Sequence, residues 1–306
     1  MTVWQLLAQQ LANGLTIGAI YALIALGYTM VYGVIQLINF AHGEVFMVGA
    51  YAALTVFLLL GGGAPLTGGA LVAVLIAGVV VAAVCCAGLG RTIERVAYRP
   101  IRQAPRLCAL ITAIGMSFFL QNAVMLLFGA NDRRFPALIP PIRWHVMGMT
   151  VTGIQVLIWT ASAALMLGLQ ALVMSTKLGK AMRATAQDAK ACWLLGIPVD
   201  RIIAVTFMIG SALASVGGVL FGLYYNTINF HDGYLMGLKA FTAAVLGGIG
   251  NIPGAMLGGF VLGMLEGLGA GYLSAQWKNV FAFVILVGLL LFKPTGLLGE
   301  RVADRA

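Results

Sequence analysis

Charged side chains are scarce in this sequence. They make up 9% of its 306 residues, whereas a soluble domain usually carries about 25%. The hydrophobic content of 61% therefore exceeds what so little polar surface can shield from water. The first Lys or Arg is Arg91, so the sequence also lacks the basic start expected of a cleaved signal peptide. These absences exclude an ordinary soluble domain and favour a protein embedded in a membrane.

Motifs for covalent chemistry are missing as well. The sequence has no G-x-x-x-x-G-K-[ST] phosphate loop, no nucleophile elbow and no metal-ligand cluster among its three histidines. Its four cysteines lie in or beside apolar runs, without metal or redox spacing. We therefore expect no catalytic residue, no metal and no cofactor, and the chain is predicted not to be an enzyme. The net charge of +9 does not indicate nucleic acid, because membrane proteins concentrate basic residues in cytoplasmic loops.

Long apolar runs fill most of the chain. Several reach the roughly 18 to 20 residues needed to cross a bilayer, and they lack the alternation typical of a barrel. The sequence therefore predicts an all-α polytopic membrane protein, with one transmembrane domain over 1–306 and about nine spans (roughly 8 to 10). The expected spans cover residues 13–36, 44–60, 69–90, 108–128, 153–174, 203–225, 235–250, 253–272 and 275–292.

Basic residues gather in three groups that predict the orientation of these spans. The groups lie at 91–106, at 177–201 and in the tail from Lys293. Because cytoplasmic loops are enriched in Lys and Arg, we expect all three groups on the cytoplasmic side. The expected spans then place the N-terminus outside and the C-terminus in the cytoplasm. Residues 129–152 would form an external loop, although they carry three arginines.

Two short stretches interrupt the apolar runs with glycine and polar residues. Residues 37–46 read LINFAHGEVF, and residues 247–254 read GGIGNIPG. Non-helical backbone at membrane depth is tolerated only beside protein or water, and transporters place broken helices along substrate paths. Two interpretations stay open, an ordinary turn between helices and a functional break near a path. The residues concerned are Asn39, His42, Gly43, Glu44, Gly247, Gly248, Gly250 and Asn251.

A short stretch in the second half of the chain is similar in sequence to the first break. Residues 38–42 read INFAH and residues 228–231 read INFH, and each stretch precedes a glycine-bearing apolar segment. On the predicted topology the two stretches lie toward opposite faces, as inverted repeats in transporters do. Nine spans permit such a repeat around the fifth, while an echo of this length also arises by chance.

Four charged residues fall within the expected spans. Lys278 lies near a span end, where its side chain can snorkel to the interface. Glu44 suits the positive N-terminal end of the helix that follows it. Lys239 and Glu266 are costly in lipid and should face protein or water. These two residues either line a path, form a structural pair or lie at the membrane interface.

The segment 177–201 is the longest polar stretch of interest. Its apolar positions recur every three or four residues, which places them on one face of a short helix: Met182, Ala186, Ala189 and Trp193. Gly196 followed by Pro198 ends that helix. A helix of this kind either rests on the lipid interface or docks into a groove on a partner.

Three stretches in one order resemble a known family. Residues 25–51, 183–207 and 237–259 closely resemble the branched-chain amino acid ABC transporter permeases of the LivH type, and the resemblance covers nearly the whole chain. It implies a multi-pass permease in the bacterial inner membrane. The partners implied are a second permease subunit, two ATP-binding subunits that hydrolyse ATP, a periplasmic substrate-binding protein and membrane lipid.

The resemblance also implies a role for residues 177–201. They match the cytoplasmic coupling loop of that family, whose hallmark is an alanine-rich helix followed by a glycine. The residues implied in coupling to the ATPase are Arg183, Ala184, Thr185, Ala186, Ala189, Trp193 and Gly196. Branched-chain amino acids are the expected substrates, with urea, amides or other amino acids as alternatives. A stand-alone channel or secondary transporter is the rival, and it would need a coupling carboxylate such as Glu44 or Glu266.

Overall fold

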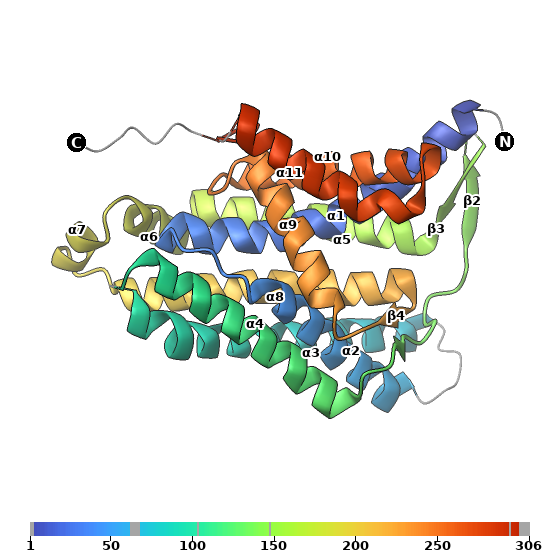
Figure 1. Cartoon of the computed structure of the whole chain (residues 1–306). Helices are drawn as coiled ribbons and strands as arrows, with labels where there is room; N and C mark the ends of the chain where they lie inside the picture. Colours follow the sequence, from blue (N-terminus) through green and yellow to red (C-terminus); the bar gives the residue numbers. More distant parts are fainter. Residues whose placement is uncertain (1–2, 62–67, 103, 147, 294, 300–306) are drawn as a thin grey trace.

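The computed structural model describes residues 3–61, 68–102, 104–146, 148–293 and 295–299. These residues form a helical bundle, and most of the helices run along its long direction (Figure 1). Seven helices of the described chain are long and apolar enough to cross a membrane. The predicted all-α polytopic membrane protein is therefore confirmed.

The long helices coincide with seven of the expected spans. They are α1 (Val3–Ile35), α2 (His42–Gly61), α3 (Gly68–Ile93), α4 (Arg106–Phe128), α5 (Gly153–Ser175), α8 (Val199–Tyr225) and α10 (Ile252–Tyr272). The shorter helices are η1 (Glu94–Tyr98), η2 (Arg99–Ile101), α6 (Lys177–Gln187), α7 (Ala189–Leu194), α9 (Asp232–Gly247), η3 (Ala275–Trp277) and α11 (Lys278–Phe292).

The expected spans at 235–250 and 275–292 correspond to two of these shorter helices, α9 and α11. They have 16 and 15 residues, whereas a full crossing needs about 20. The count of nine spans is therefore not confirmed by helix length. The difference arises because polar or glycine-rich segments shorten both helices at their ends.

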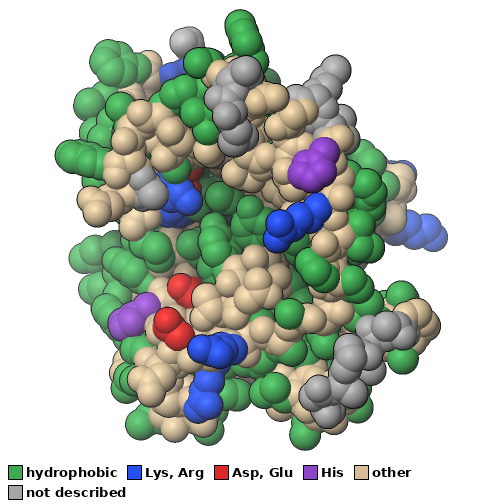
Figure 2. Space-filling model, turned by 90° about the vertical axis from the view of Figure 1, so that its right-hand side faces the viewer, with side chains coloured by type: hydrophobic (Ala, Val, Ile, Leu, Met, Phe, Trp, Pro, Cys, Tyr) green, Lys and Arg blue, Asp and Glu red, His purple; other side chains and the backbone are tan. Residues whose placement is uncertain are grey.

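Four short strands pair at one end of the bundle. β1 (Arg133–Arg134) pairs antiparallel with β4 (Thr227–Ile228), and β2 (Arg143–Val146) pairs antiparallel with β3 (Met149–Thr152). The expected loop 129–152 therefore contains both a hairpin and a strand that reaches the second half of the chain. Figure 2 looks onto this end and shows charged and histidine side chains among the apolar ones.

Helix α1 lies at the centre of the bundle and packs closely against α10. Ala22 is fully buried, and a Cβ built on Gly259 would lie 2.6 Å from the Ala22 Cα. Gly18 approaches the backbone of α10 in the same way, because a Cβ on it would lie 2.9 Å from the Gly259 oxygen. Small residues at helix interfaces permit this backbone approach in membrane proteins.

The two basic groups at 91–106 and 177–201 lie at the same end of the bundle. An ion pair of 2.6 Å between Arg99 and Asp200 joins them directly. The opposite end carries the start of α1 and the strands (Figure 1), where the Gln9 Nε2 donates to the Thr150 oxygen at 3.2 Å. The two basic groups therefore lie together at one end of the bundle, as the predicted topology requires, and the strands lie at the other end.

Candidate functional site

The first predicted break lies inside the bundle. After α1 ends at Ile35, Gln36 takes a left-handed backbone with a φ of 54°, and the chain turns back so that α2 begins within the bundle (Figure 1). Asn39, His42 and Glu44 are only 2%, 1% and 1% exposed. The stretch is therefore not a turn on the surface of the molecule.

The polar cluster at this break is built by local hydrogen bonds. The Asn39 oxygen accepts from the His42 amide at 3.0 Å, which closes the turn that starts α2. The Tyr98 hydroxyl on η1 donates to the Asn39 side-chain oxygen and to the Ile38 carbonyl, both at 3.1 Å. Tyr98 is fully buried, so it fixes the break against the end of α3.

A matching break precedes α9. Asn226 follows α8 with a φ of 55°. In the described chain, Gln36 and Asn226 are the non-glycine residues with positive φ. The Asn229 oxygen accepts from the Asp232 amide at 3.1 Å, as the Asn39 oxygen does from His42. In both places the next helix begins six residues after the left-handed residue. The sequence echo is therefore accompanied by the same backbone geometry.

The starts of α2 and α9 cross in backbone contact. A Cβ built on Gly43 would lie 2.6 Å from the Gly237 Cα, and one built on Gly237 would lie 2.9 Å from the Gly43 Cα. Gly43 lies in the first turn of α2 and its φ is not positive. Glycine is required here because two helices approach closely.

Glu44 is buried at this crossing. The Ser117 hydroxyl on α4 donates to its Oε1 at 3.0 Å. Its Oε2 has no hydrogen-bond partner among the described residues. The sequence singled out Glu44 but not Ser117, because nothing in the pattern of α4 distinguishes this serine from one that caps or packs.

Lys239 and Glu266 form an ion pair in the interior. The Lys239 Nζ lies 2.9 Å from the Glu266 Oε1, and the two residues are 3% and 1% exposed. The Tyr21 hydroxyl donates to the Glu266 Oε2 at 2.8 Å. The pair joins α9 to α10 and, through Tyr21, to α1. Of the interpretations left open by the sequence, this geometry favours the structural pair.

The second predicted break, at 247–254, lies near the start of the first, because Ile38 and Ile249 line the same small cavity. Gly248 and Gly250 have positive φ values of 107° and 96°, which glycine adopts without strain. Asn251 caps α10, because its Oδ1 accepts from the Gly254 amide at 3.0 Å. The Gly247 oxygen accepts from the Leu298 amide at 3.0 Å. This break is therefore a turn that is held by the segment after α11.

The segment 177–201 is two helices, so the prediction of one helix with one apolar face is wrong. The chain breaks at Asp188, which caps α7. Its Oδ1 accepts from the Lys190 and Ala191 amides, both at 2.9 Å. An aspartate that bonds the following amides competes with helix continuation and favours a new N-terminus.

Helix α6 packs inward. Met182 and Thr185 are each 3% exposed, and Ala184 and Ala186 are half-buried. Ala186 lines a small cavity of about 100 Å³ together with Met30 of α1. Ala186 was expected to face a partner, and the structure places it against α1.

The exposed apolar surface of this segment lies on α7 and just after it. Trp193, Leu194 and Leu195 are 71%, 77% and 80% exposed. Gly196 ends the turn with a φ of 80°. Trp193 and Leu194 border an open groove of about 740 Å³ whose other wall includes Pro198. Arg183 and Ala189 are exposed as well, so Ala189 and Trp193 of the predicted face point away from the bundle.

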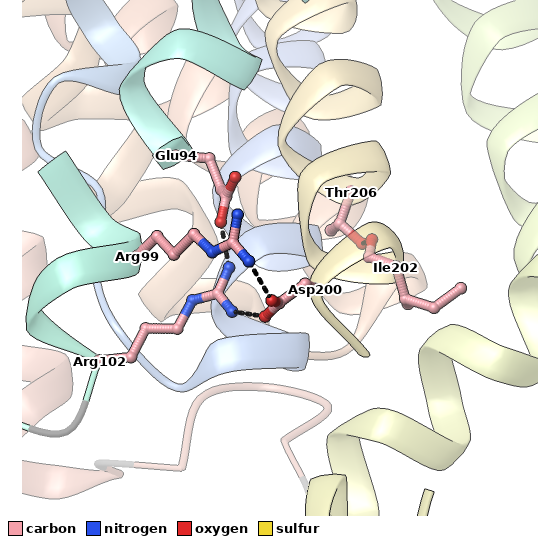
Figure 3. Close-up of polar contacts among 6 residues, drawn as sticks. All are labelled: Glu94, Arg99, Arg102, Asp200, Ile202 and Thr206. Carbon is pink, nitrogen blue, oxygen red and sulfur yellow. Dashed lines mark hydrogen bonds and ion pairs between the residues drawn. The ribbon is translucent and has the colours of Figure 1, made fainter. Parts of the chain in front are cut away.

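A network of charged side chains connects this segment to the link between α3 and α4. Asp200, in the first turn of α8, accepts from Arg99 and from Arg102, both at 2.6 Å. Arg102 also pairs with Glu94 on η1. Figure 3 shows both guanidinium groups reaching toward Asp200. Apart from the high density of arginine at 91–106, nothing in the sequence indicates these pairs.

Comparison with known proteins places the chain among transport proteins. The family described as branched-chain amino acid transport system / permease component matches residues 10–290. The high-affinity branched-chain amino acid transport system permease protein LivH of Escherichia coli K12 is 50% identical over 302 residues, 97% of each chain. The corresponding protein BraD of Pseudomonas aeruginosa is 49% identical over 301 residues, again 97% of each chain.

A more distant relative extends the same similarity. The probable branched-chain amino acid transport permease protein LivH of Methanocaldococcus jannaschii is 27% identical over 284 residues, 90% of this chain and 88% of that one. The family match covers α1 to α11 nearly completely. The chain therefore belongs to the family of branched-chain amino acid transport permease components, as the three sequence stretches predicted.

Proposed function

We propose that this chain is a permease subunit of an ABC importer and forms part of the translocation path for branched-chain amino acids. The observation that carries the proposal is near-full-length identity of about half to permeases named for high-affinity branched-chain amino acid transport. The seven long apolar helices support a multi-pass protein of the bacterial inner membrane. A second permease subunit, two ATP-binding subunits and a periplasmic substrate-binding protein complete the importer.

The substrate is tested by uptake into whole cells. Deleting the chain should abolish high-affinity uptake of labelled leucine, and in the parent strain excess valine or isoleucine should compete with it. Urea and acetamide should not compete, because they lack the aliphatic side chain. Unchanged leucine uptake in the deletion strain, with loss of urea uptake, would replace the proposal by the alternative substrate class.

The end that carries α6 and α7 faces the cytoplasm in this proposal. Two basic groups meet at that end, and Lys and Arg are enriched in cytoplasmic loops. The start of α1 and the strands are then periplasmic, and the described part of the chain after α11 is cytoplasmic. Arg133, Arg134 and Arg143 are exposed at the periplasmic end, where an extracellular partner can contact them.

Cysteine labelling of intact cells tests this orientation. In a background without the four native cysteines, we expect Trp144→Cys to react with a membrane-impermeant maleimide added from outside. Arg95→Cys should react only after the membrane is permeabilised. Both positions are exposed and lie outside the proposed contact on α7, so neither the fold nor that contact limits the reaction. Labelling of Arg95→Cys in intact cells would reverse the orientation.

Helix α7 is the contact with the ATP-binding subunit in our proposal. Trp193 and Leu194 are exposed apolar side chains at the basic end and border an open groove. Exposed apolar side chains beside a groove are typical of protein contact sites. Asp200 borders the same groove, so a force on α7 reaches Arg99 and Arg102 through their ion pairs.

Leu194→Asp should release the ATP-binding subunit. A charge buried in the contact without a partner costs several kcal/mol, which weakens binding by about tenfold for each 1.4 kcal/mol. We expect the variant to insert normally and to melt like the parent, while ATPase co-purification and transport fall by at least about tenfold.

Ala186→Asp provides the contrast, because Ala186 is half-buried and lines a cavity that it shares with α1. This variant should lower the melting temperature of the purified chain. If Leu194→Asp retains its ATPase and transports normally, α7 is an interfacial helix and the coupling proposal fails.

The translocation path in this proposal passes the crossing of α2 and α9. Asn39, His42, Gly43 and Glu44 form one side of that crossing. Gly247, Gly248, Gly250 and Asn251 form the turn that lets α9 move relative to α10. Tyr98 connects the crossing to the Arg99–Asp200 network, which supports a mechanical route from α7 to the break.

The two halves of the chain are related as an inverted repeat in this proposal. The matching left-handed residues Gln36 and Asn226, and the matching turns before α2 and α9, support it. Helices α1 to α4 would correspond to α8 to α11, with α5 between them. The break before α2 and the break before α9 enter the bundle from opposite ends (Figure 1), as inverted repeats in transporters require.

A further inference from the structure

We propose that a cavity between α1, α4 and α9 is a transit site for an amino acid with an aliphatic side chain, and that Glu44 with Ser117 receives its α-ammonium group. The inference rests on the proposed function and adds a substrate site to it. The cavity has a volume of about 160 Å³. Its walls include Tyr28, Phe40, Ser117, Phe118, Tyr234 and Gly237.

The lining of this cavity suits an aliphatic side chain. Four aromatic rings surround it, from Tyr28, Phe40, Phe118 and Tyr234, and Ser117 adds a hydroxyl. Sites for small molecules are mostly apolar, with a few placed polar groups. A cavity of about 150 Å³ accommodates a molecule the size of benzene, so this one holds the side chain of leucine, isoleucine or valine.

Glu44 contacts the polar part of the wall through Ser117. Ser117, which lines the cavity, donates to the Glu44 Oε1 at 3.0 Å. The Glu44 Oε2 has no hydrogen-bond partner in the part of the chain that the structure describes. Lys239, another buried charged residue, is already paired with Glu266 at 2.9 Å. A buried carboxylate without a counter-charge is costly, and a substrate ammonium would supply the missing charge and hydrogen bond.

The cavity can be reached from the surface of the chain. Ile114, Phe118 and Tyr234 also line it and are 41%, 55% and 52% exposed. They belong to α4 and α9, which lie on the near side in Figure 1. Gly237 forms part of the wall and is also the contact point with Gly43. A shift of α9 against α2 would therefore change the shape of the cavity.

The charge of the site is measured with thiol reagents on the complete importer in proteoliposomes. Ile114→Cys, in a background without native cysteines, places a thiol at the cavity and leaves Glu44 and Ser117 intact. We expect methanethiosulfonate-ethylammonium to react about tenfold faster than the anionic ethylsulfonate reagent, at the lower end of the effect of charged clefts on rates. Leucine should slow the reaction with the cationic reagent.

Two matched variants decide the result. Adding Glu44→Gln to Ile114→Cys should make the reaction rates with the cationic and the anionic reagent nearly equal. At Ile111→Cys, one turn away on α4 and 62% exposed, the ratio of the two rates should not change when Glu44→Gln is added. A rate ratio that Glu44→Gln leaves unchanged would overturn the proposal. The labelling is scored on protein that elutes as the assembled complex, so a partial folding defect does not obscure it.

Transport separates this inference from the proposed function. Glu44→Gln should lower ATP-driven leucine uptake at least about tenfold with ATP hydrolysis retained, and Glu44→Asp should restore part of the uptake. If the parental importer and the Glu44→Gln importer take up leucine equally well, the inference fails and the proposed function stands. Parental importer without leucine uptake overturns the proposed function itself.

Discussion

Gly43→Ala is expected to lower leucine uptake by at least about tenfold. The added methyl carbon would lie 2.6 Å from the Gly237 Cα and still closer to the Gly233 oxygen, so the starts of α2 and α9 must separate. Overpacking of a well-packed site costs about 1–3 kcal/mol, and here the neighbouring atoms are backbone atoms that cannot rotate away. Uptake of labelled leucine, normalised to the amount of the chain in the membrane, measures the effect.

A glycine on another helix provides the control. A Cβ on Gly168 of α5 meets nothing within 4 Å, so Gly168→Ala should transport like the parent. The Gly43→Ala chain should still reach the membrane, because alanine keeps the length and the apolar character of α2 and the other long helices are unchanged. Normal transport by Gly43→Ala would show that the crossing tolerates separation and is not a working part of the path.

Lys239→Met is expected to destabilise the chain more than any surface substitution. It leaves Glu266, which is 1% exposed, without its cation. Removing one partner of a buried pair typically costs about 3–5 kcal/mol. The melting temperature in detergent and the accumulation of the chain in the membrane should both fall strongly. Lys180→Met, at an exposed position on α6, should leave both unchanged.

The double variant Lys239→Met/Glu266→Gln tests the origin of that loss. Removing both charges eliminates the unpaired carboxylate, so a large part of the stability should return. Tyr21 can still donate to the glutamine oxygen. A Lys239→Met chain that melts and accumulates like the parent but fails to transport would assign the pair to the path instead of to the fold.

The polar interruptions were the most informative part of the sequence. The cluster that contains Asn39, Gly43 and Glu44 stands out because the flanking residues are apolar, and the structure buries all three. Its echo before α9 has the same backbone geometry. Apolar run length predicted the seven long helices, but it could not separate a full span from the shorter α9 and α11.

The sequence could not settle contacts between distant helices. Nothing in the local pattern indicates that Ser117 faces Glu44, because this contact depends on how helices cross. A pair of Lys239 and Glu266 was one interpretation of the sequence, but only the crossing of α9 and α10 distinguishes it from the others. The stretch that contains Gly43 was interpreted as an ordinary turn or a functional break. The role of Gly43 in the structure is close approach to Gly237, a residue that only the tertiary structure brings near.

The error at 177–201 has a local cause. The apolar spacing fits α6, but the side chain of Asp188 bonds the amides of Lys190 and Ala191 and starts a new helix. Helical periodicity counts apolar positions and does not detect such a cap. Aspartate is a strongly preferred N-cap residue, so the sequence held the signal for a break that the periodicity obscured.

We expect this chain, with its partner subunits, to import branched-chain amino acids at the expense of ATP. The most direct test of this import is uptake of labelled leucine by proteoliposomes that contain the purified importer, with the binding protein supplied on the periplasmic face. We expect uptake that requires ATP at the face carrying α7 and that ceases when the ATP-binding subunits are omitted. Leucine uptake by the chain without those subunits, driven by a proton or ion gradient, would contradict the account and favour a secondary transporter.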